Sequence, residues 1–295
     1  MVAMGNFFLT LLQIVTPIFA ISSMALVGVK NNPRDVVLPL LNWRLVAAAL
    51  IANFGLVPPL AWGVSRLLSL AEPFEIGLML VAVSSGAPVI VMFVQTAGGN
   101  LALTGTMIVL LAIATVIYMP LVLPRALAGD VKVHAVTIAM TLGWTMLLPL
   151  VIAAGIRAWA RRWAQWLAPI LAPVSTTSLW LSVVSTVLAD VRGVLKIFGK
   201  GAILAGLLVT VGSFVFGYLL GGRSQESRTV LGFATGQRNI AASMVVATQD
   251  FAGDRDVAAM VMVTSLVALA ILFPTAFALR KRANGGLDER SRLPP

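Results

Sequence analysis

Polar side chains and one positive charge interrupt an apolar stretch of the chain near residue 236. Gly236, Gln237, Arg238 and Asn239 fall near the middle of a segment that is otherwise apolar, 228–250. A charge at the centre of a bilayer costs at least about 2.5–3.5 kcal/mol on insertion scales, so it usually faces a protein-lined cavity. Such a cluster predicts a helix that is interrupted to expose backbone groups to a ligand, with Arg238 facing the cavity. Two simpler roles stay open: Arg238 reaches a membrane interface from a helix contact, or it neutralises carbonyls of an unwound segment.

A second break lies in another apolar stretch, at Val83-Ser-Ser-Gly-Ala-Pro88. Pro88 removes a helical N–H and clashes with the preceding turn, while Gly86 tolerates backbone conformations that other residues avoid. An ordinary proline kink would explain these two residues alone. Interrupted helices at corresponding positions of two halves of a chain, however, are typical of transporter binding sites, where exposed half-helix N-termini attract an anion.

The composition is that of a membrane protein. The chain of 295 residues is 59% hydrophobic and 11% charged, with a mean hydropathy of +0.97, values outside the range of soluble domains. Its net charge of +10 therefore indicates a positive-inside bias rather than a nucleic-acid partner. The absence of cysteine excludes disulfides and thiolate chemistry. No intramembrane protease pattern is present, so we expect no enzyme.

Apolar stretches of about 20 residues, each long enough to cross a bilayer, recur along the chain. Charged or Pro- and Gly-rich breaks divide them into nine predicted spans, at 6–28, 38–65, 74–97, 101–124, 134–157, 166–189, 197–220, 228–250 and 257–279. The first span lacks the basic start of a signal peptide, and we expect it to be a retained helix. The predicted fold class is therefore an all-α membrane protein with nine transmembrane helices.

Charge is distributed unevenly between the two ends of these spans. The side that includes the C-terminus carries 13 basic and four acidic residues, a net charge of +9, whereas the opposite side carries seven of each. By the positive-inside rule, this predicts a plasma- or inner-membrane protein with its C-terminus in the cytoplasm and its N-terminus outside. The charged segment 283–295 is predicted to be a disordered cytoplasmic tail.

Serines recur on one face of the sixth predicted span. Ser175, Ser178, Ser182 and Ser185 are spaced by three, four and three residues, which places them on one side of a helix. This hydroxyl stripe suits a solute path, and it suits equally a close helix contact between small residues.

Three motifs together resemble the bile acid:sodium symporter superfamily over nearly the whole chain. The first is the turn Gly28-Val-Lys-Asn-Asn-Pro-Arg-Asp35. The second is Ser84-Ser-Gly-Ala-Pro88, followed by Asn100 and Leu101-Ala-Leu103. The third is Thr235-Gly-Gln-Arg-Asn-Ile-Ala-Ala-Ser243, which is similar to the Gly-x-Gln-Asn core of the family's second crossing helix.

The resemblance implies a fold of inverted repeats, with ten helices or with nine when the first is absent. Residues 1–282 would form one transporter domain. A panel domain would contain spans 6–28, 134–157 and 166–189, and a core domain would contain 38–124 and 197–279. Two broken helices would cross at the centre of the core.

The family's sodium site is altered in this chain. Matching Gly236 and Asn239 places Ala234 at the family's Glu and Arg238 at its Gln. The other positions that the resemblance assigns to ion-binding oxygens hold Ile90, Val91, Ile108, Thr104 and Asn53. Because the carboxylate and most hydroxyls are missing, we expect no sodium coupling by the family mechanism, with Arg238 as a tethered cation in its place.

The sequence therefore predicts a secondary transporter that moves a small organic anion by alternating access, with the lipid bilayer as its other partner. The expected substrate-binding residues are Arg238, Asn239, Gln237, Asn53, Thr104, Gly236 and Pro88, with no metal or cofactor site. One alternative is a sodium-dependent symporter of the bile-acid type with a reduced ion site. Another is a membrane sensor or partner subunit that kept the fold without transporting.

Overall fold

The computed structural model describes residues 2–32, 37–126, 135–189, 201–251 and 254–291, and all regular structure within them is helical. Five helices are long and unbroken: α1 (Val2–Lys30), α7 (Leu101–Ala126), α10 (Arg161–Ala189), α12 (Ala202–Leu220) and α15 (Arg255–Ser291). The prediction of an all-helical membrane protein is confirmed at this level.

Two further long helices each contain a π-helical turn. The first runs from α3 (Trp43–Leu50) through η2 (Ile51–Leu56) into α4 (Val57–Leu67), after the short 3-10 helix η1 (Leu38–Leu41). The second runs from α8 (Ala135–Leu142) through η3 (Gly143–Leu147) into α9 (Leu148–Trp159). With these two, seven helices among the described residues are long and apolar enough to cross a membrane.

The remaining helices form two interrupted pairs. α5 (Glu72–Val83) ends before α6 (Ile90–Ala97), and α13 (Gln225–Gly236) ends before α14 (Ile240–Gln249). Each half is too short to cross a bilayer alone. The interruptions fall at 84–89 and 237–239, where the two polar breaks were predicted.

Helix ends differ from the predicted spans where capping residues intervene. The second span begins at Trp43 rather than at residue 38, because the Asn42 side chain caps α3 by accepting a hydrogen bond from the Leu45 N–H. At the other end of the chain, α15 is helical to Ser291, beyond residue 283 where the predicted disordered tail begins.

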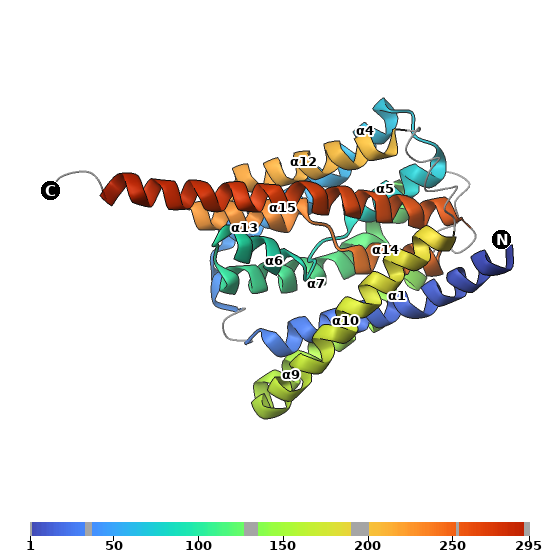
Figure 1. Ribbon diagram of the computed structural model, residues 1–295, viewed down its shortest axis with the longest axis horizontal. Helices are drawn as coiled ribbons and strands as arrows, with labels where there is room; N and C mark the ends of the chain where they lie inside the picture. Colours follow the sequence, from blue (N-terminus) through green and yellow to red (C-terminus); the bar gives the residue numbers. More distant parts are fainter. Residues whose placement is uncertain (1, 33–36, 127–134, 190–200, 252–253, 292–295) are drawn as a thin grey trace.

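The helices form two groups, with α7 and three of the four broken-pair helices between them. Helices α1, α9 and α10 pack together on one side, at an angle to the rest, while α12, α13 and α15 lie on the opposite side (Figure 1). Helices α5, α6, α7 and α14 run between the two groups (Figure 1). Phe19 and Ala20 of α1 meet Ala241 and Val245 of α14 in a small buried cluster, which joins the first group to the broken helices.

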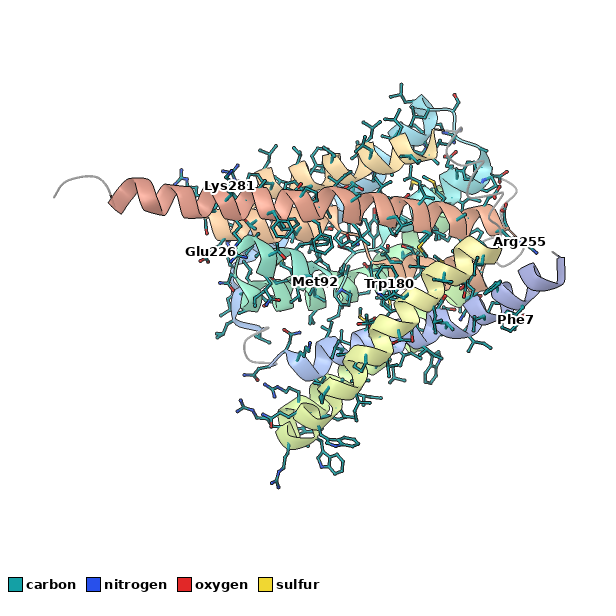
Figure 2. The ribbon with its side chains drawn as sticks, viewed as in Figure 1. Phe7, Met92, Trp180, Glu226, Arg255 and Lys281 are labelled. Atoms are coloured by element: carbon teal, nitrogen blue, oxygen red, sulfur yellow. The ribbon has the colours of Figure 1, made fainter. Side chains whose placement is uncertain are left out.

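Charged residues lie toward the two ends of the molecule and apolar side chains between them. Lys281 and Glu226 lie toward one end and Arg255 toward the other (Figure 2). Between these ends, Met92 and Trp180 are 53% and 59% exposed on the outside. Large apolar side chains on the surface between the two charged ends are expected to contact lipid tails. The membrane normal therefore runs from one charged end of the molecule to the other.

Candidate functional site

The two helix breaks contact each other directly. The Asn239 N–H donates to the Ser84 carbonyl (3.4 Å), and the Asn239 side-chain amide donates to the carbonyls of Ser85 and Gly86 (both 3.3 Å). The hydroxyls of Ser84 and Ser243 lie 2.5 Å apart, and the Ser243 hydroxyl also donates to the Leu80 carbonyl. Backbone groups that each broken helix leaves unpaired are therefore satisfied by the other break.

Gly86 makes the first break fit against α7. Its φ of +80° belongs to the left-handed region, and a Cβ there would lie 2.4 Å from the Ala112 nitrogen and 2.7 Å from the Ile108 carbonyl oxygen. Both contacts are with backbone, which cannot move without disturbing α7. Beside it, the Ser85 N–H donates to the Thr115 hydroxyl at 2.8 Å, which fixes the break to the same helix.

Gly86→Ala should therefore lower the free energy of unfolding by about 3 kcal/mol or more, the sum of left-handed strain and a backbone clash. Gly98→Ala is the matched control, because Gly98 also has a left-handed φ of +73° but has open space where a Cβ would stand. It should cost only about 1 kcal/mol. Thermal denaturation of both purified variants measures the difference, and equal melting temperatures would contradict the clash.

The second break places Asn239 and Gln237 in different environments. Asn239 caps α14, since its side-chain oxygen accepts from the Ala242 N–H at 3.2 Å. Gln237 is fully buried, and its Nε2 donates to the Arg238 carbonyl at 3.1 Å. Its Oε1, by contrast, has no hydrogen-bond partner among the described residues. A buried acceptor without a partner costs free energy, so Gln237 is the polar group at this break that has capacity left for a ligand.

Arg238 is buried, and protein oxygens accept hydrogen bonds from all five of its N–H groups. Nε donates to the Val81 carbonyl at 3.2 Å, and Nη2 donates to the carbonyls of Ala82 (2.5 Å) and Asn53 (3.4 Å). Nη1 donates to the Asn53 Oδ1 at 2.7 Å and to the Thr235 carbonyl at 3.2 Å. In this conformation no N–H of Arg238 is left for a solute, because a guanidinium has five donors.

Prolines explain why two carbonyls near Arg238 lack the backbone N–H partner that a continued π-helical turn would give them. In η2 the Val57 N–H donates back to the Ala52 carbonyl, the π-helical spacing of five residues. The next two residues are Pro58 and Pro59, which have no N–H to continue this pattern from the carbonyls of Asn53 and Phe54. Arg238 donates to the first of these carbonyls and the Tyr118 hydroxyl to the second, at 2.6 Å.

The charge of Arg238 is stabilised by helix dipoles, which carry no net charge, rather than neutralised by a carboxylate. Among the described residues, no Asp or Glu forms an ion pair with it; the ion pair found joins Arg66 and Glu75 at 3.4 Å, near one end of the molecule. The carbonyls of Val81 and Ala82 belong to the last turn of α5, and that of Thr235 to the last turn of α13. A helix C-terminus carries roughly half a negative charge, so two of them stabilise one guanidinium.

Only some of the predicted site residues lie together. Asn53 contacts Arg238 as predicted, and its Oδ1 also accepts from the Ser85 hydroxyl at 2.7 Å. Thr104 does not join them: its hydroxyl donates to the Asn100 carbonyl at 2.8 Å, and it lies about 16 Å of helix rise before Thr115, the α7 residue at the break.

Gly236 and Pro88 shape the breaks. Gly236 ends α13, where a Cβ would lie 3.0 Å from the Cβ of Phe214. Pro88 precedes α6, and its carbonyl accepts from the Val91 N–H at 3.3 Å. Neither position offers a side-chain polar atom. The positions that the family resemblance assigns to ion-binding oxygens include Ile90, Ile108 and Ala234, which are fully buried among apolar side chains.

The structure adds residues that sequence reasoning missed. Thr235 accepts a hydrogen bond from the Asn53 amide at 3.0 Å. On α7, the Thr115 hydroxyl accepts from the Ser85 N–H of the first break, and the Tyr118 hydroxyl donates to the Phe54 carbonyl of η2. Only Pro58-Pro59 could have indicated part of this arrangement from the sequence. Two adjacent prolines inside an apolar span have no N–H groups, so they leave two carbonyls of the preceding turn without backbone partners.

The serine stripe on α10 faces the protein interior. Ser175, Ser178, Ser182 and Ser185 are all buried, whereas Thr176 and Thr177 beside them are exposed. The stripe lies on the helix that packs closely against α1 (Figure 1). The burial of these serines favours a helix contact between small residues. A role for the same serines in a solute path stays a prediction.

Comparison with known proteins agrees with this architecture. No curated protein matches the chain. A family model, described as the SBF-like CPA transporter family, matches residues 8–278, which include every helix of the site. The chain therefore belongs to the SBF-like CPA transporter family, a family of membrane transporters.

Proposed function

We propose that this protein is a secondary transporter of a small organic anion, in which the guanidinium of Arg238 replaces an exchangeable cation. The observation that carries the proposal is the complete coordination of Arg238 by five protein oxygens where the two broken helices meet. Carbonyls at the ends of half-helices are typical ligands of coupling cations in transporters. Here a covalently attached cation occupies that position, so no free cation is needed to balance the dipoles.

The same geometry supports an anionic solute that Arg238 attracts without touching. The buried charge has no carboxylate partner among the described residues, so a net positive charge remains where the two breaks meet. An anion next to the crossing is stabilised by this charge, while a cation is repelled. Arg238 thus serves both roles that its sequence context suggested, as the neutraliser of carbonyls and as the charge that favours an anion.

Gln237 is the residue that we expect to contact the solute. It lies at the crossing, one residue from Arg238, and its Oε1 is unpaired among the described residues. The neighbouring α14 meets α1 through Phe19 and Ala20, and Thr16, one turn earlier on α1, has a buried hydroxyl without a described partner. Movement of the α1, α9 and α10 group against the broken helices would expose these groups in turn to either side.

We also propose the nine-span topology, with each interrupted pair crossing the membrane once and the two halves related as inverted repeats. Seven long helices and two interrupted pairs give nine crossings, and nine crossings place the termini on opposite sides, as the charge difference of +9 against zero favours. Reporter fusions at the two ends test this, and reporters on the same side would contradict it.

A thermal-shift screen of organic anions on the purified protein, followed by uptake of the best binder into proteoliposomes, tests the function. Saturable uptake supports transport, and tight binding without any uptake would indicate a membrane sensor of the same fold. Uptake that requires a sodium gradient would instead indicate a symporter with a reduced ion site.

Gln237→Met should weaken binding of that anion about tenfold while lowering stability by only about 1 kcal/mol, because the amide oxygen has no partner and the variant loses a single hydrogen bond, from Nε2 to the Arg238 carbonyl. Asn239→Leu is the contrasting variant. Its side chain makes two hydrogen bonds to the other break and caps α14 with a third, so the free energy of unfolding should fall by about 2–3 kcal/mol. Binding isotherms and melting temperatures separate the two, and unchanged affinity in Gln237→Met would remove Gln237 from the site.

A further inference from the structure

A cavity with two arginines opens between the start of α3 and the turn that joins α12 to α13. Its volume is about 460 Å³, within the range of small-ligand sites. Arg44 and Arg223 line it, together with Asn42, Leu220, Gly222 and Ser224. The cavity is open beside Gly222, since no atom lies within 4 Å of the place where a Cβ would stand.

The charge in this cavity is positive and uncompensated by the described residues. Arg44 makes a cation–π contact with Trp43, its guanidinium carbon 5.7 Å from the ring centre, and Arg223 has no described ion pair. Glu226 is the nearest acid in the sequence, but it does not line the cavity and its carboxylate accepts from the Asn100 amide at 3.5 Å. Two arginines without a carboxylate favour a phosphate group.

Apolar side chains on both sides of the cavity are exposed on the surface. Leu41 before α3 and Trp43 at its first residue are 76% and 70% exposed, and Leu219 and Leu220 at the end of α12 are 64% and 38% exposed. Tryptophan is enriched where lipid headgroups meet the hydrocarbon. A ligand here would place a phosphate between the arginines and apolar chains along these side chains.

We propose that this cavity binds the headgroup of an anionic phospholipid, such as phosphatidylglycerol. Basic pockets between transmembrane helices are suited to such headgroups, and each arginine near the membrane surface strengthens the attraction. The exposed leucines and Trp43 favour a lipid over a soluble phosphate compound, because only a lipid has acyl chains to cover them. The lipid would hold the start of α3 against the α12–α13 turn.

Native mass spectrometry of the full-length protein in mixed micelles of phosphatidylglycerol and phosphatidylcholine tests the proposal. The wild type should retain phosphatidylglycerol in preference to phosphatidylcholine, and the double variant Arg44→Gln/Arg223→Gln should bind it about thirtyfold more weakly. The double variant Arg161→Gln/Arg162→Gln is the matched control. It removes two exposed arginines at the start of α10 that do not line the cavity, and it should retain the lipid like the wild type.

Two results would overturn the proposal. Equal retention of phosphatidylglycerol by both double variants would show that any surface arginines suffice. Displacement of the lipid by glycerol phosphate at equal concentration would show that the cavity binds a soluble phosphate instead. Melting temperatures in phosphatidylcholine alone should be the same for all three proteins, since the four arginines are exposed. These readouts do not involve transport, so they are independent of the proposed function.

Discussion

Arg238→Met should prevent the protein from folding stably, not merely weaken a ligand. The guanidinium is the partner of the Ala82 and Thr235 carbonyls, for which the described residues offer no backbone donor, and of the Asn53 carbonyl, which Pro58 cannot reach with an N–H. Each unpaired buried carbonyl costs about 1–3 kcal/mol. Removing the buried charge recovers part of this, and we expect a net loss of about 4 kcal/mol, comparable to breaking a buried ion pair. The measurement is the melting temperature in detergent, with the yield of monodisperse protein.

Two further variants make this result specific to the coordination of Arg238. Arg238→Lys keeps the charge but has three N–H donors without a planar fork, so it should recover only part of the stability. Arg66→Met removes an arginine that is 64% exposed in its pair with Glu75, and it should change stability by less than about 1 kcal/mol. A stable Arg238→Met protein that binds no anion would contradict the coordination and restore Arg238 as a direct substrate ligand.

Asn53→Asp should reduce anion affinity about thirtyfold while the protein remains folded. The new carboxylate would face Arg238 where the Asn53 Oδ1 now accepts at 2.7 Å, and it would cancel the uncompensated charge. For a solute charge roughly 8 Å away and an effective dielectric constant of about 20, the lost attraction is about 2 kcal/mol. The bonds from the Asn53 amide to the Ala49 carbonyl and to the Thr235 hydroxyl are lost, but the new ion pair offsets them.

Asn53→Ser separates charge from hydrogen bonding. It removes the amide and adds no charge, so it should lower the melting temperature more than Asn53→Asp and weaken the anion less. Binding isotherms of the best anion from the screen, compared with melting temperatures, distinguish the two effects. Equal affinities for Asn53→Asp and Asn53→Ser would contradict a long-range electrostatic role for Arg238.

The sequence predicted the helix breaks because their causes are local. Gly86 and Pro88 mark the first, and Gly236 with Asn239 marks the second, each inside an apolar stretch. The helices end within a few residues of these positions, since proline, glycine and a capping amide act on their own turn of backbone. The boundary at 98–100 was predictable for the same reason: Gly98 ends α6 in the left-handed region and Asn100 caps α7.

The environment of Arg238 could not be predicted, because its acceptors come from three segments. Asn53, Val81 with Ala82, and Thr235 are brought together only when η2 packs against both breaks. Whether five donors are all taken depends on carbonyl directions, which the sequence does not encode at any one position. The family pattern placed Asn53 near Arg238, which it contacts, and it also placed Thr104 there, which lies about three helical turns before Thr115, the α7 residue at the first break.

The most direct test of a guanidinium that replaces an exchangeable cation is the melting temperature of the purified wild-type protein during a titration with sodium chloride. Choline chloride keeps the ionic strength constant, and potassium and lithium serve as comparisons. Since five protein oxygens are already bound by Arg238, we predict the same melting temperature at every sodium concentration. A saturable rise in melting temperature with sodium, absent with potassium and lithium, would show a bound sodium ion and contradict this account.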